Sequence, residues 1–261
     1  MSNAIDDAAE LIAANRLLRG QLAPLPEACR PFDEPTAYKV QRRVHEFLAI
    51  AGRGVIAGQK VGCTTEVMQR YLGIDHPCAG GVFATSVKER SGRFRVRDFC
   101  RAGVECELVA RLIKDLARPG ADYGRNEVMA AVGAWMPGIE IVDDRYLDYR
   151  TLDVWTLVAD DFFNAACVIG DPVVLDTELA SLTGCMTVNG QEVGRGTGRD
   201  ILGDPLAALA WLANAKIRHG EPLAAGAFVF LGSMVRTQWV GPGDQVAISI
   251  DGLGSVAAEF E

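Results

Sequence analysis

Residues 182–193 have the sequence LTGCMTVNGQEV, in which two runs of strand-forming residues flank Asn189-Gly190. Asn-Gly between two such runs is the strongest short-range signal for a two-residue β-hairpin, because both residues adopt positive φ readily. Further strand-like runs follow it along the chain, at residues 227–233, 245–250 and 255–260. The C-terminal part is therefore predicted to contain consecutive strands joined by tight turns.

Upstream of this hairpin, strands and helices both occur. Strands are expected at residues 54–62, 103–113, 138–143 and 167–175. Helices are expected at residues 6–18, from Glu34 to about 51, at 126–135 and at 205–218. A short helix to residue 72 precedes residues 75–81, DHPCAGG, whose Pro and Gly residues predict a loop.

Regular alternation of strands and helices is absent from this pattern, and most helices lie in the first half. The pattern predicts an α+β fold with a mainly antiparallel β core. A chain of 261 residues is long enough for one large domain or for a domain with a smaller lobe. We expect a helical N-terminal lobe at residues 1–90 and a β-rich catalytic domain at 91–261, or one continuous domain.

Composition excludes several classes of function. The net charge is −8 with no basic run, so no nucleic-acid or anionic-membrane partner is expected. No apolar run reaches 18 residues, and the N-terminus lacks the pattern of a signal peptide. The seven cysteines include no Cys-x-x-Cys pair, so free thiols in a reducing compartment are expected. A cytoplasmic enzyme fits these features.

The sharpest local feature is Val104-Glu105-Cys106-Glu107-Leu108. In a strand, Glu105 and Glu107 share one face about 6.6 Å apart, while their apolar neighbours face the core. Glu140 is a carboxylate in the otherwise apolar run 138–142. Either the paired glutamates form a solvated polar face, or the three carboxylates hold a hard cation such as Mg²⁺ or Mn²⁺.

Other polar residues also have both an ordinary and a functional interpretation. Lys60, between Gly58 and Gly62, is either a surface lysine or part of a ligand pocket, since the flanking glycines permit close approach of the backbone. Asp75 suits a turn, and Asp160-Asp161 suits another. The sequence GRGTG at 194–198 lies outside any βαβ unit, so it is only a weak nucleotide-binding signal.

Five segments in this order resemble the 2-keto-4-pentenoate hydratase / 4-oxalocrotonate decarboxylase family of the fumarylacetoacetase-type superfamily. They are GQKVGCTTEVMQRYLGID (58–75), GVECELVARL (103–112), PGIEIVDDR (137–145), VNGQEVGRGTGRDILGDPLAALAWLANA (188–215) and GLGSVAAEF (252–260). The resemblance extends from about residue 35 to the end. It implies a β roll or sandwich with a helical N-terminal part, and assembly into a homo-oligomer.

The resemblance also implies roles for individual residues. Glu105, Glu107 and Glu140 would be ligands of Mg²⁺ or Mn²⁺. Lys60 and Asp75 would be the catalytic residues, and Lys60, Asp160 and Ser233 would contact a small 2-oxo or enol carboxylate. Two positions depart from the family pattern: Cys78 stands where a second loop carboxylate is usual, and Asp161-Phe162-Phe163 replaces Asn-Ala-Ser.

These roles lead to three hypotheses. The first is a lyase that hydrates a 2-hydroxy-2,4-dienoate, as in the catabolism of aromatic compounds. The second is decarboxylation or C–C hydrolysis of a related 2-oxo acid, since all these reactions pass through a stabilised enolate. The third is a non-catalytic relative that binds a small acid. Because the metal ligands would be the same in each, they do not choose among the three.

Overall fold

The computed structural model describes residues 3–261, in which the strands form one sheet of eight strands and one of five. The order in the large sheet is β2 (Cys78–Phe83), β1 (Ile56–Gly62), β10 (Phe228–Ser233), β5 (Ala102–Leu112), β6 (Val132–Asp143), β7 (Asn164–Ile169) and β3 (Val87–Glu89), with β11 (Gln238–Trp239) also paired to β5. Only β1–β10 and β3–β7 are parallel among these described pairs. Because β2 also contacts β7, the sheet curls into a roll.

The small sheet covers one side of this roll. Its order is β4 (Ser91–Phe94), β13 (Gly254–Phe260), β12 (Gln245–Ile250), β8 (Thr183–Val188) and β9 (Gln191–Thr197). The β8–β9 hairpin turns at Asn189 (φ 52°) and Gly190 (φ 77°), as the sequence predicts. β12 and β13 contact β6 of the large sheet. The predicted α+β roll or sandwich with mainly antiparallel strands is confirmed.

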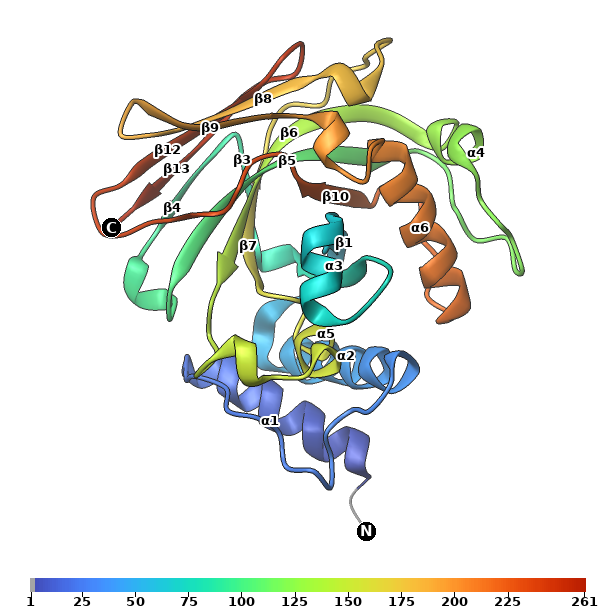
Figure 1. Cartoon of the computed structure of the whole chain (residues 1–261), viewed down its shortest axis with the longest axis vertical. Coiled ribbons are helices and arrows are strands. Elements are labelled where there is room, and N and C mark those ends of the chain that lie inside the picture. Colours follow the sequence, from blue (N-terminus) through green and yellow to red (C-terminus); the bar gives the residue numbers. More distant parts are fainter. Residues whose placement is uncertain (1–2) are drawn as a thin grey trace.

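The N-terminal helices lie together at the end of the molecule opposite the small sheet (Figure 1). α1 (Ala4–Leu18) packs on α2 (Glu34–Leu48), which continues into a short π-helix, η1 (Ala49–Arg53). α2 also contacts α5 (Val154–Ala159). The start of α2 follows from its sequence, since the Asp33 side chain accepts a hydrogen bond from the Thr36 N–H.

Three further α-helices border the roll: α3 (Glu66–Leu72), α4 (Arg125–Met129) and α6 (Pro205–Arg218). Five 3₁₀ turns complete the described helices: η2 (Ala84–Ser86), η3 (Val96–Asp98), η4 (Tyr149–Thr151), η5 (Leu179–Ser181) and η6 (Gly198–Asp200). α6 has the predicted ends, with Asp204 as N-cap and Gly220 at φ 72° beyond the last turn. No helix in residues 3–261 combines the length and the apolar character that crossing a membrane requires.

Two of the expected elements are wrong. The predicted loop at 75–81 contains the beginning of β2, because its glycines serve close packing rather than a turn. A Cβ on Gly80 would lie 2.9 Å from the Asp161 carbonyl oxygen, and one on Gly81 would lie 2.7 Å from His45 Cε1. The predicted helix 126–135 ends at Met129, and β6 begins at Val132. Pairing of β6 with β5 along its length overrides the local helical pattern.

The division near residue 90 does not coincide with a boundary between sheets. β1, β2 and β3 all come from the first 90 residues, of which residues 3–90 are described. β1 pairs with β10, and β3 pairs with β7, so both belong to the same sheet as β5 and β6. The large sheet therefore contains strands from both sides of residue 90, and the division into a lobe and a domain stays a prediction.

Alternation along β5 divides the side chains between two faces of the large sheet. Val104, Cys106 and Leu108 belong to the main hydrophobic core. Glu105, Glu107 and Val109 point to the opposite face. On that face a second buried cluster contains Val82, Val109, Met136, Cys167, Ile169, Phe228 and Phe230. The roll therefore places the glutamates on the same face as this second buried hydrophobic cluster.

Candidate metal centre

The central pair of strands, β5 and β6, brings three carboxylates together. Glu105 lies directly opposite Glu140, and Glu107 lies opposite Gly138. One carboxylate oxygen of each glutamate lies within 4.8 Å of the other two. Glu107 and Glu140 are each 1% exposed, and Glu105 is half-buried. The structure therefore brings together the three residues that the sequence proposes as metal ligands.

Neighbouring groups hold each glutamate in place. The hydrogen bonds run from Asn164 Nδ2 to Glu140 Oε1 at 2.9 Å, from Gly232 N–H to Glu107 Oε2 at 2.9 Å, and from Thr237 Oγ1 to Glu105 Oε1. Glu140 Oε2, by contrast, is buried with no hydrogen-bond partner. Buried polar atoms are almost always satisfied, so this oxygen points to a missing partner.

Lys60, on β1, is the cation nearest to these carboxylates. Its Nζ lies 3.4 Å from Glu140 Oε1, and the side chain is 3% exposed. Burial alone would lower the pKa of Lys60, but Glu140, Glu105 and Glu107 together raise it above its ordinary value. Lys60 is therefore protonated at neutral pH and faces the candidate ligands as a cation.

Burial and mutual repulsion disfavour the charged forms of the carboxylates. Burial and then repulsion from Glu140 raise the pKa of Glu105, and burial with repulsion from Glu140 and Glu105 raises the pKa of Glu107 well above its usual range. A single lysine does not balance three acidic groups. All-oxygen donors, an unsatisfied oxygen and excess negative charge together fit a hard divalent cation.

A cavity of about 620 Å³ opens beside Glu105 and Lys60. Its walls are mainly apolar, and they include Val67, Met68 and Leu72 from α3 together with Val142, Phe162 and Phe163. Lys60 and Arg236 are its basic residues among those described. Such a space suits a small molecule with a charged end near Lys60 and a hydrocarbon part against the aromatic rings.

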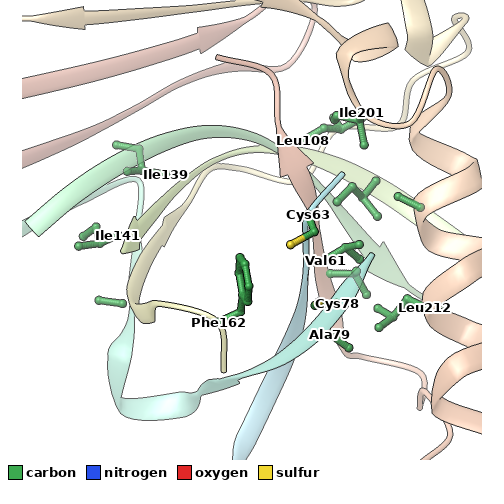
Figure 2. Packing of buried hydrophobic residues seen from close by; sticks show 14 of the residues in the cluster. Val61, Cys63, Cys78, Ala79, Leu108, Ile139, Ile141, Phe162, Ile201 and Leu212 are labelled. Atoms are coloured by element: carbon green, nitrogen blue, oxygen red, sulfur yellow. The ribbon is translucent and has the colours of Figure 1, made fainter. Parts of the chain in front are cut away.

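The turn that carries Phe162 and Phe163 has an unusual backbone. Asp161, Phe162 and Phe163 have φ values of 56°, 45° and 68°, a left-handed run that costs about 1–2 kcal/mol per residue without glycine. Phe162 packs against Gly62, and its ring lies 5.3 Å from Lys60 Nζ. Figure 2 shows it facing the ends of β1 and β2.

Asp161 fastens this turn to the N-terminal half of the chain. Its Oδ1 accepts a hydrogen bond from Gly81 N–H at 2.8 Å and lies 2.7 Å from His45 Nε2. Its Oδ2 lies 2.7 Å from Arg16 Nη1. Burial alone would raise the pKa of Asp161, but His45, Arg16 and the Gly81 N–H lower it well below its usual range. The departure at 161–163 therefore has a structural basis.

The other predicted site residues are dispersed. Ser233 lines the cavity, where its hydroxyl donates to the Val235 carbonyl oxygen at 2.6 Å. Asp160 is buried outside the cavity lining and pairs with Arg145 Nε at 3.0 Å. Asp75 is exposed on a bend between α3 and β2, also outside the lining. Their roles in substrate binding and catalysis stay predictions.

Sequence reasoning missed several residues of the site. Asn164 had a usable signal, because it is polar within the apolar run 162–169, just as Glu140 is within its own strand. Thr237 and Gly232 had none, since their contacts with Glu105 and Glu107 depend on β10 and the segment after it lying beside β5 in the large sheet. Phe162 and Phe163 were noted only as a departure from the family pattern, and no role in the cavity was predicted for their rings.

A family model described as fumarylacetoacetate hydrolase C-terminal matches residues 82–261. The chain belongs to this family. The match covers β5, β6, β7 and β10, and thus all three glutamates, while Lys60 lies before it. The family membership confirms the resemblance found from the sequence segments.

Three relatives are similar to this chain over most or all of their length. The chain is 32% identical over 260 residues to a 2-keto-4-pentenoate hydratase of Paraburkholderia phymatum, covering 99% of this chain and 98% of the relative. It is 34% identical to 2-keto-4-pentenoate hydratase 1 of Dechloromonas aromatica, covering both chains completely. A 4-oxalocrotonate decarboxylase of Pseudomonas putida is 29% identical over 226 residues, which is 86% of this chain and 84% of that one.

A solved structure agrees with these relatives. The 4-oxalocrotonate decarboxylase of Pseudomonas putida G7, complexed with magnesium and adipate, superposes with a TM-score of 0.91 at 28% identity. The alignment covers 98% of this chain and 97% of that one. The relatives are therefore enzymes of two kinds on one fold, hydratases and decarboxylases.

Proposed function

We propose that the chain is a metal-dependent hydro-lyase that adds water to a 2-hydroxy-2,4-dienoate and gives a 4-hydroxy-2-oxo acid. The observation that carries this proposal is the buried cluster of Glu105, Glu107 and Glu140, with Glu140 Oε2 unsatisfied, beside a largely apolar cavity. The identity to 2-keto-4-pentenoate hydratases over the full length supports the same reaction.

The three glutamates would hold the ion, and Mg²⁺ or Mn²⁺ suits their oxygen donors. When bound, a divalent cation supplies stabilisation of negative charge on the 2-oxygen of the substrate. Relatives on this fold support the choice, since the decarboxylase structure contains magnesium. Asn164, Gly232 and Thr237 would fix the carboxylate positions through their hydrogen bonds.

Lys60 would bind the anionic end of the substrate. It is buried and protonated, and it lines the cavity next to the glutamates. Phe162 and Phe163 would hold the hydrocarbon part and exclude bulk water from the reacting carbons. The Ser233 hydroxyl lies in the same cavity and would add a polar contact to substrate.

Proton transfer between oxygen and carbon needs an acid or base near the substrate. Lys60 is the first candidate, because it already lies in the cavity. Asp75 is the second, and it would act only if the segment between α3 and β2 moves toward the cavity. Asp160, which is bound by Arg145, would contribute by holding the turn that follows it.

The direct test follows the loss of ultraviolet absorbance of 2-hydroxypenta-2,4-dienoate with Mg²⁺ or Mn²⁺ present. We expect turnover that disappears when divalent ions are removed and returns when they are restored. The product should be the 4-hydroxy-2-oxo acid without release of CO₂. Metal binding without turnover across a panel of dienols and 2-oxo acids would instead favour a non-catalytic small-acid-binding relative.

Decarboxylation of a dicarboxylic 2-oxo acid is the second candidate, with C–C hydrolysis as a variant of it. One observation favours it: the exposed Arg236 lines the cavity and has no hydrogen bond or ion pair to its guanidinium in the described structure. This guanidinium would suit a second carboxylate on the substrate. CO₂ release from 4-oxalocrotonate, with no hydration of the monocarboxylic dienoate, would establish this alternative.

We further propose that the enzyme is a cytoplasmic homo-oligomer. All seven cysteines are free, which suits a reducing compartment. Light scattering of the purified chain tests the assembly, and a single species with the mass of one chain would exclude it.

A further inference from the structure

A second cavity, of about 430 Å³, lies between the N-terminal helices and the strands β3 and β4. It shares no lining residue with the cavity beside the glutamates. Seven basic side chains line it: Arg16, Arg19, Arg53, Lys88, Arg93, Arg95 and Arg145. Asp98 and Asp143 are its acidic residues among those described. This excess of positive charge occurs in a chain whose net charge is −8.

Most of these cations already have acidic partners. Asp98 lies 3.0 Å from Arg19 Nη1 and 2.8 Å from Arg95 Nη2, and Glu259 lies 3.0 Å from Arg93 Nε. The side chains of Arg53 and Lys88 are different. Neither makes a hydrogen bond or an ion pair within residues 3–261. They are therefore free to contact a molecule in the cavity.

The environment of Arg53 shows that the charges are close enough to interact. Partial burial, followed by repulsion from Arg16, Arg19 and Arg145, lowers the pKa of the Arg53 guanidinium. Like charges gathered in a concave, partly desolvated space are unfavourable unless an anion neutralises them. The same arrangement concentrates field lines and attracts anions from solution.

We propose that this cavity is a binding site for a small anion with two or more negative groups, of the polycarboxylate or phosphate class. Guanidinium groups bind carboxylate and phosphate oxygens through paired N–H donors, and Lys88 adds a point charge. A single carboxylate would match only one of the two unpaired cations, Arg53 and Lys88. The proposed site is distinct from the cavity beside the glutamates, because the two cavities have no lining residue in common.

The cavity also touches the segment that shapes the candidate metal centre. Arg16 donates to Asp161 Oδ2 and to the Asn164 carbonyl oxygen, and Arg145 donates to Asp160. That segment carries Phe162 into the other cavity. An anion that draws on Arg16 or Arg145 would act on the turn at 160–164 from its opposite side, as an effector would.

The proposal is tested by binding of inorganic phosphate and of propane-1,2,3-tricarboxylate to the full chain. Titration calorimetry is done at constant ionic strength, with Mg²⁺ in excess over either anion and chloride as the reference salt. We expect saturable binding of at least one of the two, and their relative affinities show whether carboxylates or phosphate is preferred. No saturable binding of either anion would overturn the proposal.

Variants locate the site. The double variant Arg53→Gln with Lys88→Gln removes the two unpaired cations without breaking an internal ion pair, and we expect its affinity to fall by about tenfold or more. The control, Arg30→Gln with Lys114→Gln, makes the same change of charge at exposed residues outside the cavity and should bind as the wild type does. Equal losses in both variants would contradict the proposal.

A second control separates this site from the metal centre. Glu107→Gln should leave anion binding unchanged, because Glu107 does not line this cavity. Loss of anion binding in that variant would assign the anion to the metal centre and overturn the proposal. Neither control depends on turnover, so failure of the proposed hydratase activity would not affect the result.

Discussion

Single atoms determine what the candidate metal centre can do. Glu140 is held through Oε1 by Asn164 and Lys60, while its Oε2 is buried without a partner. Glu107 and Glu105 each keep one oxygen bound by a neighbour. The carboxylates are thus oriented in advance, and the groups behind them have a measurable role.

Asn164→Ala removes the hydrogen bond that positions Glu140. Contacts behind a metal ligand typically change metal affinity by about 10–100-fold, so we expect a loss of that size for Mn²⁺. Calorimetric titration measures it. Cys185→Ala, on the small sheet, is the control and should bind Mn²⁺ as the wild type does; an unchanged affinity in Asn164→Ala would contradict the positioning role.

Lys60→Met removes the buried cation for which we propose a contact with the substrate. General acid–base catalysis contributes about 10²–10⁴-fold, so kcat/KM should fall by about 100-fold or more. Affinity for Mn²⁺ should rise, because a positive charge 3.4 Å from Glu140 is gone. Steady-state kinetics and a metal titration of the same sample separate the two effects. Wild-type kcat/KM would remove Lys60 from the mechanism.

At the scale of elements, the left-handed turn between α5 and β7 connects the N-terminal helices with the candidate metal centre. Asp161 binds Arg16 from α1, His45 from α2 and the backbone of β2. These contacts offset the strain at 161–163 and keep Phe162 against Gly62. The helical end is therefore part of the active-site scaffold, although its side chains lie outside the cavity.

Asp161→Asn tests this connection. Breaking a buried ion pair typically costs about 3–5 kcal/mol, so the free energy of unfolding should fall by about 3 kcal/mol at neutral pH. Folding lowers the pKa of Asp161, so the ionised Asp161 contributes its full stabilisation of the folded state at pH values above the ordinary carboxyl pKa. This contribution is lost as the pH falls below the ordinary carboxyl pKa toward the lower pKa of Asp161 in the folded protein. The difference from wild type should shrink below about pH 4.

Urea unfolding at several pH values measures this effect. Asp171→Asn is the matched control, since the Arg90–Asp171 pair is exposed and should contribute less than about 1 kcal/mol. If Asp161→Asn unfolds as the control does, the turn is held by other contacts.

Elements with strong local signals could be predicted from the sequence. Asn189-Gly190 predicted the β8–β9 hairpin, and Asp204 with Gly220 predicted α6. Elements that depend on pairing between distant segments could not be predicted from the sequence. The glycines of β2 serve contacts with Asp161 and His45, which no local pattern contains. The helical pattern before Pro137 gave way to pairing of β6 with β5.

At the scale of the whole molecule, the roll brings together residues that are far apart in sequence. Alternation in two short segments made Glu105, Glu107 and Glu140 candidates, and the family resemblance implied their role as metal ligands. The contacts of Thr237 and Gly232 depend on the pairing of β10 and the segment after it with β5, more than a hundred residues away in the sequence, so they could not be predicted. The same closure buries Glu107 and Glu140 and half-buries Glu105, at a cost that a cation would offset.

Removal of divalent ions should therefore destabilise the whole chain. A ligand at about 100 times its Kd stabilises by about 2.7 kcal/mol, which corresponds to a shift in Tm of about 5 °C for a chain of this size. Calorimetric melting after chelation and dialysis, and again after Mg²⁺ or Mn²⁺ is restored, measures it. KCl at the same ionic strength is the control, and an equal rise with KCl would exclude a specific site.

The most direct measurement is titration of Mn²⁺ into the wild type and into Glu107→Gln, with circular dichroism to verify that both are folded. We expect one ion per chain in the wild type and no measurable binding in the folded variant. Equal affinity in the two proteins would contradict the assignment of the three glutamates as the metal centre.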